Sequence, residues 1–262
     1  MMSLTLGGGP LVAKNPPDSN YEIHGPTHRI LWDRFPRRVR AELGSETVLD
    51  TTNGRLLHES QMRPVLYVPE ADVAGELLEP TDTRTTCPFK GEASYWSVRA
   101  GDRLAKDAVW AYPEPNGEAP WLAGHYAFYW DKLDAWYDED EQVFGHLRDP
   151  FHRVDVRPTS RRVTVSGNGE PLAESGRAMV LSETGLPNRI YIPLEDVREG
   201  LLEPSDTHTH CSYKGEASYW SVNAGERRLE DAVFGYPEPF DDAIRIGGFV
   251  CFLHDDVETS IA

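Results

Sequence analysis

The sequence has few cysteines and no long apolar run. Its three cysteines, Cys87, Cys211 and Cys251, are too few and too far apart for a disulfide framework, so we expect free thiols. No apolar run approaches the roughly 20 residues that a transmembrane helix needs. Residues 1–20 also lack the charged and apolar segments of a secretory signal. These absences predict a cytoplasmic protein with no membrane partner.

Basic residues are outnumbered by acidic ones. The chain has 26 lysines and arginines against 43 aspartates and glutamates, which gives a formal net charge of -17. Such a chain repels phosphate backbones on average, so we do not expect nucleic acid as a partner. A basic set between His28 and Arg40 is expected to be a solvated charged face, and the alternatives are that it holds an anion or faces the acidic run Asp138–Glu141. The sequence contains no phosphate-cradling glycine loop, and we predict no cofactor.

The most informative feature that is present is an internal repeat. The nine residues KGEASYWSV begin at Lys90 and again at Lys214, an offset of 124. From Leu77 to Pro115 this offset holds without a gap, and 27 of the 39 positions are identical. Identity at this density over such a length indicates a duplicated domain.

Upstream of that block, turn residues suggest a different offset. Asn53–Gly54 matches Asn168–Gly169, and Glu59–Ser60 matches Glu174–Ser175, both at an offset of 115. On this alignment the second copy carries nine extra residues between Ser175 and Tyr191. The first copy would then have a nine-residue deficit, which makes a pocket less expected there than in the second copy.

Copies of roughly 105 residues are too long for solenoid repeats and suit autonomous domains. We therefore predict an N-terminal arm over residues 1–31, a first repeat domain over 32–136, an acidic connector over 137–152 and a second repeat domain over 153–262.

Within each copy the pattern is mostly that of strands. Apolar and polar residues alternate over Ala93–Val98, and the Asn-Gly pairs predict hairpin turns. A proline followed by acidic residues, at Pro69 and again at Pro193, predicts about two turns of helix. We expect two mainly β domains, each with one short helix.

The repeated string resembles a known family. KGEASYWSV is preceded by L-L-E-P-S/T-D and followed by D-A-V-W/F and Y-P-E-P, which is similar to tandem two-domain members of the bacterial domain of unknown function 427 family. The resemblance implies the β-tent fold, in which two small antiparallel sheets are joined at one edge. It implies no established function.

The resemblance also raises the question of zinc, because many β-tent proteins hold this metal with two pairs of cysteines. A tetrahedral zinc site needs four close nitrogen or sulfur ligands. The nearest set in this sequence is His208, His210 and Cys211, and the first copy has Arg84 and Thr86 in place of the histidines. We therefore predict no metal site.

The best candidate site is a pocket with aromatic walls and a lysine at its mouth. An ammonium group offers three hydrogen-bond donors, and ligand sites combine apolar walls with a few polar groups. The predicted ligand-binding residues of the second domain are Lys214, Tyr219, Trp220, Phe234 and Tyr236. Those of the first domain are Lys90, Tyr95, Trp96, Trp110 and Tyr112. Packing of these aromatic residues in a core is the alternative interpretation.

Two other functions remain open. A thiol beside an ammonium can act as a nucleophile, so Cys211, Lys214 and Glu216 could form the catalytic set of a hydrolase or transferase. The same residue types recur at Cys87, Lys90 and Glu92. The chain could also be a structural or protein-interaction module without a pocket.

Overall fold

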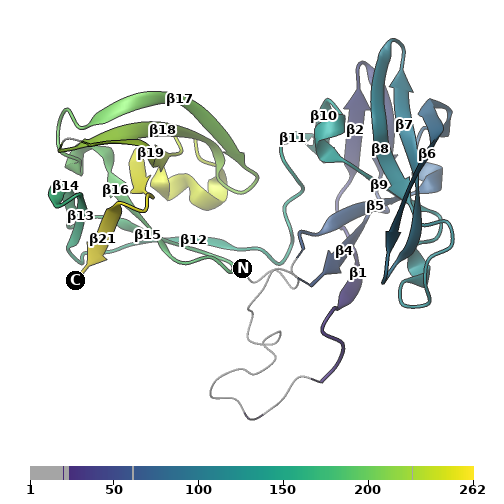
Figure 1. Cartoon of the computed structure of the whole chain (residues 1–262), viewed down its shortest axis with the longest axis horizontal. Coiled ribbons are helices and arrows are strands. Elements are labelled where there is room, and N and C mark those ends of the chain that lie inside the picture. The colour runs from purple at the N-terminus through teal and green to yellow at the C-terminus, as the bar shows by residue number, and fades with distance from the viewer. Residues whose placement is uncertain (1–19, 21–23, 61, 226) are drawn as a thin grey trace. The chain divides into compact units, whose positions relative to one another are not determined.

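The computed structural model describes residues 20, 24–60, 62–225 and 227–262. The chain divides into two compact units, which we call domain 1 (up to Asp149) and domain 2 (from Pro150). Most of the predicted arm, residues 1–19 and 21–23, lies outside the described residues. Each domain is mainly β, with one larger and one smaller antiparallel sheet (Figure 1).

In the described part of domain 1, the larger sheet has seven strands in the order β1-β4-β5-β9-β8-β7-β6, and the smaller has the order β11-β10-β2-β3. The larger sheet consists of β1 (Ile30–Arg34), β4 (Arg55–Glu59), β5 (Val65–Pro69), β9 (His125–Phe128), β8 (Arg103–Ala111), β7 (Gly91–Ala100) and β6 (Leu78–Cys87). The smaller consists of β11 (Glu141–Val143), β10 (Ala135–Asp138), β2 (Val39–Leu43) and β3 (Glu46–Thr51). Strand β1 thus begins within the predicted arm, and β11 lies in the predicted connector.

Domain 2 repeats this arrangement over its described residues, with a smaller sheet of three strands in the order β14-β13-β21. Its larger sheet consists of β12 (Val154–Pro158), β15 (Met179–Glu183), β16 (Arg189–Pro193), β20 (Phe249–Phe252), β19 (Arg227–Gly235), β18 (Gly215–Ala224) and β17 (Leu202–Cys211). The smaller consists of β14 (Glu170–Ser175), β13 (Val163–Gly167) and β21 (Val257–Ile261).

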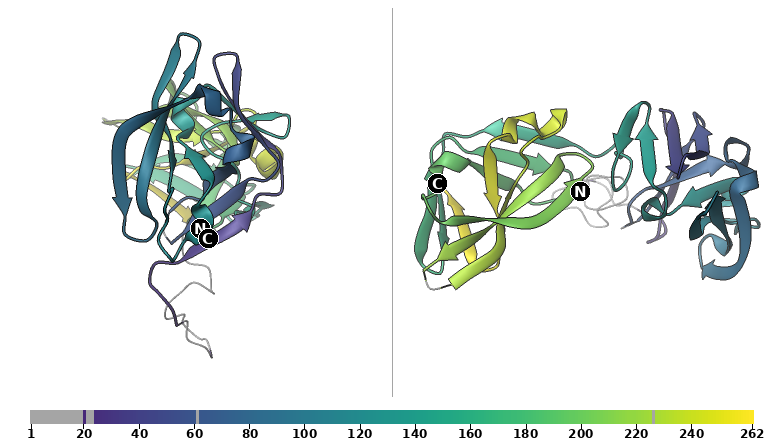
Figure 2. Two further views of the ribbon diagram at one scale, coloured as in Figure 1. Left: turned by 90° about the vertical axis from the view of Figure 1, so that its right-hand side faces the viewer. Right: turned by 90° about the horizontal axis from the view of Figure 1, so that it is seen from above.

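The helices are short 3-10 segments (Figure 2). They are η1 (Glu70–Asp72), η2 (Gly75–Leu77), η3 (Pro120–Leu122), η4 (Trp130–Lys132), η5 (Leu194–Asp196) and η6 (Asp241–Ile246). The helices predicted after Pro69 and Pro193 are η1 and η5, and each is one turn long rather than two. The reason is that the next residues return to a sheet, since Val73 forms a β-bridge with Leu49 and Val197 forms one with Ala173.

Each strand of domain 1 from β1 to β9 has a counterpart in domain 2 that begins 124 positions later in the sequence. The predicted nine-residue deficit of the first copy is therefore wrong. Strand β3 (Glu46–Thr51) corresponds to β14 (Glu170–Ser175), and β4 (Arg55–Glu59) corresponds to β15 (Met179–Glu183). The counterpart of Glu59 is therefore Glu183, not Glu174. No residues are missing from the first copy in this region.

The error came from the two Asn-Gly pairs. Asn168–Gly169 is the two-residue turn of the β13–β14 hairpin, where Asn168 has φ of 50° and Gly169 has φ of 82°. Its counterpart in domain 1 is the Gly44–Ser45 turn of the β2–β3 hairpin. Asn53–Gly54 instead joins β3 to β4, which belong to different sheets, so the hairpin predicted there is wrong.

The Asn168–Gly169 turn of the β13–β14 hairpin allows a test of backbone strain. We expect Gly169→Ala to lower the free energy of unfolding of domain 2 by about 1 kcal/mol, because alanine is strained in the left-handed region. Gly176→Ala is the matched control, since Gly176 is also exposed and open on its Cβ side but has no positive φ. Denaturant unfolding of both variants measures the difference, and equal effects would contradict the assigned turn.

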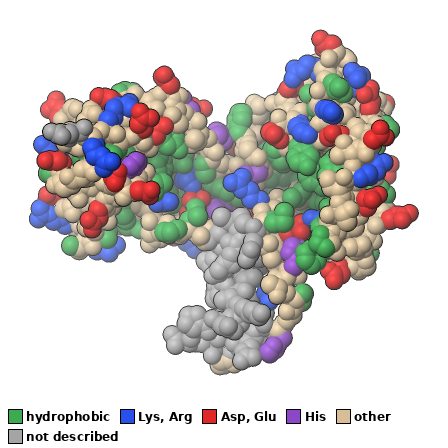
Figure 3. Space-filling model, in the orientation of Figure 1, with side chains coloured by type: hydrophobic (Ala, Val, Ile, Leu, Met, Phe, Trp, Pro, Cys, Tyr) green, Lys and Arg blue, Asp and Glu red, His purple; other side chains and the backbone are tan. Residues whose placement is uncertain are grey.

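Each larger sheet packs apolar side chains on both of its faces. On β7 the side chains of Ala93 and Tyr95 belong to one cluster, with Leu122 of η3. Trp96 and Val98 belong to another, which the smaller sheet covers. The alternation expected for Ala93–Val98 is therefore present, and neighbouring aromatic residues on a strand lie on opposite faces of the sheet. Acidic and basic side chains are mixed over the visible face of each domain (Figure 3).

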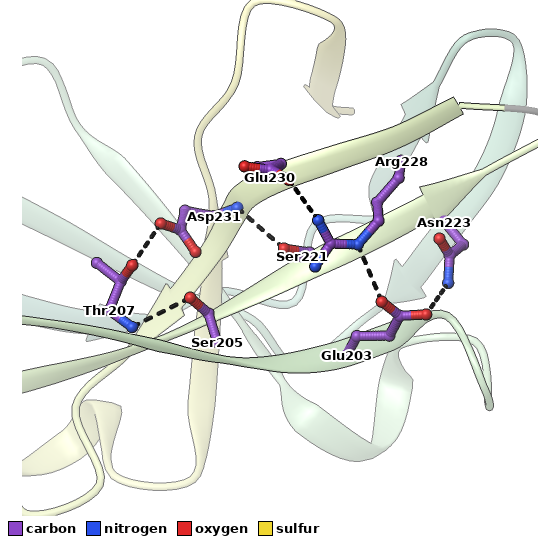
Figure 4. Close-up of polar contacts among 8 residues, drawn as sticks. All are labelled: Glu203, Ser205, Thr207, Ser221, Asn223, Arg228, Glu230 and Asp231. Atoms are coloured by element: carbon purple, nitrogen blue, oxygen red, sulfur yellow. Dashed lines mark hydrogen bonds and ion pairs between the residues drawn. The ribbon is translucent and has the colours of Figure 1, made fainter.

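A polar network fixes an irregularity in the larger sheet of domain 2. Asp231 has φ of 48°, its backbone N–H donates to Ser221 Oγ (3.3 Å), and its Oδ2 accepts from Thr207 Oγ1 (2.6 Å). Figure 4 shows these contacts beside the hydrogen bond from Thr207 N–H to Ser205 Oγ. Hydrogen bonds from Ser205 and Thr207 hold the pKa of Asp231 below its usual value. Asp107 has the same φ in domain 1, so we assign these aspartates to the scaffold.

Candidate functional site: a histidine–glutamate–lysine chain in each domain

In domain 1, one buried carboxylate holds both a lysine and a histidine. Lys90 Nζ donates to Glu59 Oε1, and His28 Nε2 lies 3.1 Å from Glu59 Oε2. The Glu59 side chain is only 3% exposed and that of Lys90 9%, whereas that of His28 is 21% exposed. The chain of contacts therefore runs from a buried ammonium group to a partly accessible imidazole.

Domain 2 contains the same chain at the same spacing. Lys214 Nζ donates to Glu183 Oε2 (2.6 Å), and His152 Nε2 lies 3.0 Å from Glu183 Oε1. In each domain the glutamate comes 31 positions after the histidine, and the lysine comes 31 positions after the glutamate. We call these two sets the HEK chains.

Strand pairing explains how residues so far apart in sequence meet. The histidine precedes the first strand of the domain, which pairs with the strand that ends in the glutamate, as Ile30 opposite Glu59 shows. The lysine lies in the turn between β6 and β7, where its backbone carbonyl accepts from Asn116 N–H (3.0 Å). The next residue, Gly91, has φ of 105°, and a Cβ there would lie 3.1 Å from the Glu114 carbonyl. Glycine is therefore required beside the lysine.

Aromatic rings enclose both ends of the chain. The His28 ring stacks on Phe89 with ring centroids 3.9 Å apart, and His152 stacks on Tyr213 at the same distance. At the other end, Lys90 Nζ lies 5.7 Å from the centre of the Tyr112 ring. These contacts limit the orientations available to the imidazole and to the ammonium group.

The electrostatics favour an ionised carboxylate. Burial alone would raise the pKa of Glu183, but the hydrogen bond from His152 and the charge of Lys214 outweigh it, so the pKa is lowered. The nearby Tyr236 phenol has a raised pKa, chiefly because it is buried. The glutamate is thus charged and the tyrosine neutral at neutral pH.

A pocket of about 430 Å³ lies at the histidine end of the chain in domain 1. Its lining residues are Pro26, Thr27, His28, Ser60, Phe89 and Glu118. A carboxylate only accepts hydrogen bonds, so His28 Nε2 must carry the hydrogen that it donates to Glu59. In a neutral imidazole the other ring nitrogen, Nδ1, is then a hydrogen-bond acceptor. The pocket therefore combines an oriented imidazole, a carboxylate and two hydroxyl groups.

The predicted aromatic wall is divided between two faces of the sheet. In domain 1, Tyr95, Trp110 and Tyr112 pack together on the face that carries the HEK chain. Trp96 packs in the cluster on the opposite face, edge-on against Tyr126 with ring centroids 5.1 Å apart.

Domain 2 divides its predicted aromatic residues in the same way. Tyr219, Phe234 and Tyr236 lie in one cluster and Trp220 in the other. The structure therefore brings Lys214 and three of the four predicted aromatic residues to one face, without Trp220.

The predicted Cys-Lys-Glu set is also divided. Lys214 pairs with Glu183, whereas the Glu216 side chain is 68% exposed and lies 3.5 Å from His208 Nδ1. Cys211 is half-buried and packs in the cluster that contains Tyr219. In domain 1, Lys90 likewise pairs with Glu59 rather than with the exposed Glu92.

Two classes of feature are not found among the residues that the structure describes. No group of three or more histidine, cysteine, aspartate or glutamate side chains in that part could hold a metal ion, and His208 and His210 form no such group with Cys211. The same described residues include no helix long and apolar enough to cross a membrane.

Sequence reasoning found the lysines but missed their partners. The signal was present, since Pro-x-His-Arg occurs at Pro26–Arg29 and again at Pro150–Arg153, at the offset of 124. The first copy of this motif falls in the predicted arm and the second at the predicted connector and domain boundary, where no site is expected from the sequence. Glu59 was noticed but matched to Glu174.

Comparison with known proteins adds the following findings. The family model described as "Domain of unknown function (DUF427)" matches residues 32–139 and, a second time, residues 155–262. The search of curated proteins found no match. Both matched segments begin a few residues after the histidine of the HEK chain.

Proposed function

The chain belongs to the DUF427 family, with two tandem copies of its domain, and from the HEK chains we propose that it is a small-molecule-binding protein. The observation that carries the proposal is the same buried lysine–glutamate–histidine contact in both domains. In this proposal Lys90 and Lys214 hold the glutamates in place rather than contact the ligand, and the ligand binds at the histidine end of the chain rather than against Trp220.

Stability explains why neither charge can be removed alone, but it does not explain why an ion pair occupies this buried position. Replacing a buried ion pair with well-packed apolar residues of similar volume is often neutral or stabilising. Both domains keep the same three ionisable residues, and two of these, the histidine and the glutamate, lie outside the block of highest identity between the copies. A carboxylate that orients an imidazole beside a pocket is a common arrangement for binding and proton transfer, which supports a functional role.

The pocket in domain 1 suits a molecule that donates hydrogen bonds. His28 presents an acceptor nitrogen when neutral, and the Glu118 carboxylate also only accepts. Ser60 is already engaged, since its hydroxyl accepts from Arg29 N–H (2.9 Å). Small amines, amides and polyols are the chemical classes that match this set.

We expect a thermal-shift screen of such compounds against the full chain to find one that binds at His28. At a hundredfold excess over Kd, binding should stabilise the native state by about 2.7 kcal/mol. His28→Ala should abolish the shift, because it removes the oriented acceptor, and Glu118→Gln should weaken it. Calorimetric titration of the same variants would give the change in affinity.

His125→Ala is the matched control, because His125 is another half-buried imidazole of domain 1 but packs edge-on against Trp32, outside the lining of this pocket. A ligand whose shift survives His28→Ala would place binding elsewhere. If no compound distinguishes the wild type from His28→Ala, the structural or protein-interaction alternative gains support.

A hydrolase or transferase remains the second proposal only in altered form. Because Glu216 pairs with His208, the carboxylate beside Lys214 would have to be Glu183. Cys211 would still be the nucleophile. No further observation favours catalysis over binding.

A further inference from the structure

In domain 1 the two nitrogens of the His28 ring have different surroundings. Nε2 lies 3.1 Å from Glu59 Oε2, whereas Nδ1 has no hydrogen bond to another described residue. The Glu59 side chain is 3% exposed and the His28 side chain 21%, so the accessible part of the ring lies away from the glutamate. His28 also lines the pocket of about 430 Å³, and Nδ1 is therefore the ring nitrogen that a bound molecule can reach.

The two protonation states of this ring offer opposite hydrogen-bonding groups at Nδ1. In the neutral ring Nε2 holds the hydrogen that Glu59 accepts, so Nδ1 is an acceptor. A second proton binds at Nδ1, and the imidazolium then donates from both nitrogens. Protonation therefore keeps the hydrogen bond to Glu59 and converts Nδ1 from an acceptor into a donor.

Charged groups from several elements act on the ring. Glu59, at the end of β4, favours the imidazolium, and Lys90, which donates to the same carboxylate, opposes it. Glu118 lines the pocket and also favours the imidazolium. Arg29 contacts the lining through its backbone N–H, which donates to Ser60 Oγ (2.9 Å). In the protonated state the ring and Glu118 are the two charged groups of the lining, and their charges are opposite.

We propose that protonation of His28 reverses the ligand preference of this pocket, from molecules that donate a hydrogen bond to molecules that accept one. The inference rests on the proposed function, because it concerns the same pocket. The acceptor class consists of uncharged carbonyl compounds, since the protonated lining has no net charge. Stacking on Phe89, with ring centroids 3.9 Å apart, limits the orientation of the imidazole in both states. We assign the reversal to domain 1, because the His152 side chain is only 6% exposed.

The test titrates two uncharged bicyclic probes of similar size into the full chain: indole, which donates a hydrogen bond, and indanone, which accepts one. The NMR signals of the His28 ring report both its protonation and the binding of each probe. From about pH 8 to about pH 5.5, across the range in which imidazoles titrate, indole should bind more weakly and indanone more tightly. Each affinity should change about fivefold, which corresponds to one net hydrogen bond.

Variants identify the group that titrates. His28→Gln does not ionise, so the affinities of both probes should no longer depend on pH. Glu118→Gln removes the other charge of the lining and should keep the reversal. His125→Gln should also keep it, because His125 packs edge-on against Trp32, outside the lining of this pocket. If His28→Gln fails to fold, the wild-type titration still decides, since it is read at the His28 ring itself.

Three results would overturn the inference. Affinities that depend on His28 but stay constant while its ring titrates would refute the reversal alone and leave the proposed function intact. A pH dependence that persists in His28→Gln would assign the reversal to another group. If neither probe perturbs the His28 signals at either pH, the reversal fails together with the choice of this pocket as the binding site.

Discussion

Replacing Glu183 with alanine should lower the free energy of unfolding of domain 2 by about 3–5 kcal/mol. The substitution leaves Lys214, whose side chain is 9% exposed, without the carboxylate that accepts its hydrogen bond. An uncompensated buried charge costs far more than the ion pair itself contributes. Native-state hydrogen exchange of the central strands β16 and β20 in the full chain would measure the loss in this domain alone.

Glu216→Ala is the charge-matched control, because it removes the same charge from an exposed side chain of the same domain. It should cost about 1 kcal/mol or less. The double variant Glu183→Leu with Lys214→Met should recover part of the loss, since the buried ammonium group is removed while the His152 imidazole still loses its acceptor. A loss for Glu183→Ala no greater than that for Glu216→Ala would show that Lys214 finds another partner.

The effect of Glu183→Ala should also depend on pH. The pKa of Glu183 is lower in the folded state than its unfolded value of about 4.3, so its ionised form stabilises the native state fully above that pH. This stabilisation declines as the pH falls toward the folded pKa. The difference between wild type and variant should therefore shrink on acidification.

Replacing Trp96 with alanine should lower the free energy of unfolding of domain 1 by about 3 kcal/mol and leave ligand binding at His28 unchanged. The ring packs against Tyr126 in the core between the two sheets, and its removal leaves a cavity. The pocket lies on the other face of the sheet. Leu104→Ala, at a 48% exposed position of β8, is the control and should cost far less.

Unfolding and titration of the two variants together separate packing from binding. A loss of affinity in the folded Trp96→Ala protein would indicate that Trp96 contributes to the ligand site, as the sequence predicted. A cost equal to that of Leu104→Ala would show that the cavity collapses.

Local patterns predicted the fold better than they predicted the site. Alternation over Ala93–Val98 placed the strand and its two faces correctly, because side-chain direction in a strand depends only on sequence parity. The duplication itself was evident from identity. The second offset was wrong because an Asn-Gly pair reports a turn, and equivalent turns in two copies need not use the same residues.

Local sequence patterns could not predict the contacts of the HEK chain, for a different reason. Its three residues lie on separate strands, and only the sheet register brings Glu59 to Lys90. Lys90 and Lys214 were predicted site residues because they recur in both copies beside aromatic residues. The partner of Lys90 was sought nearby, at Glu92, although that side chain is exposed.

The strand order also explains the repeated L-L-E-P motif. Among the described residues, β6 and β17 are the last strands of their sheets, so each of these ten-residue strands has one edge without a neighbouring strand there. Pro80 and Pro204 lack an N–H group, and the acidic residues around them repel a second strand. Two similar edge strands in one polypeptide would otherwise be able to pair at a high effective concentration. The motif therefore disfavours the addition of a further strand at this edge of each sheet.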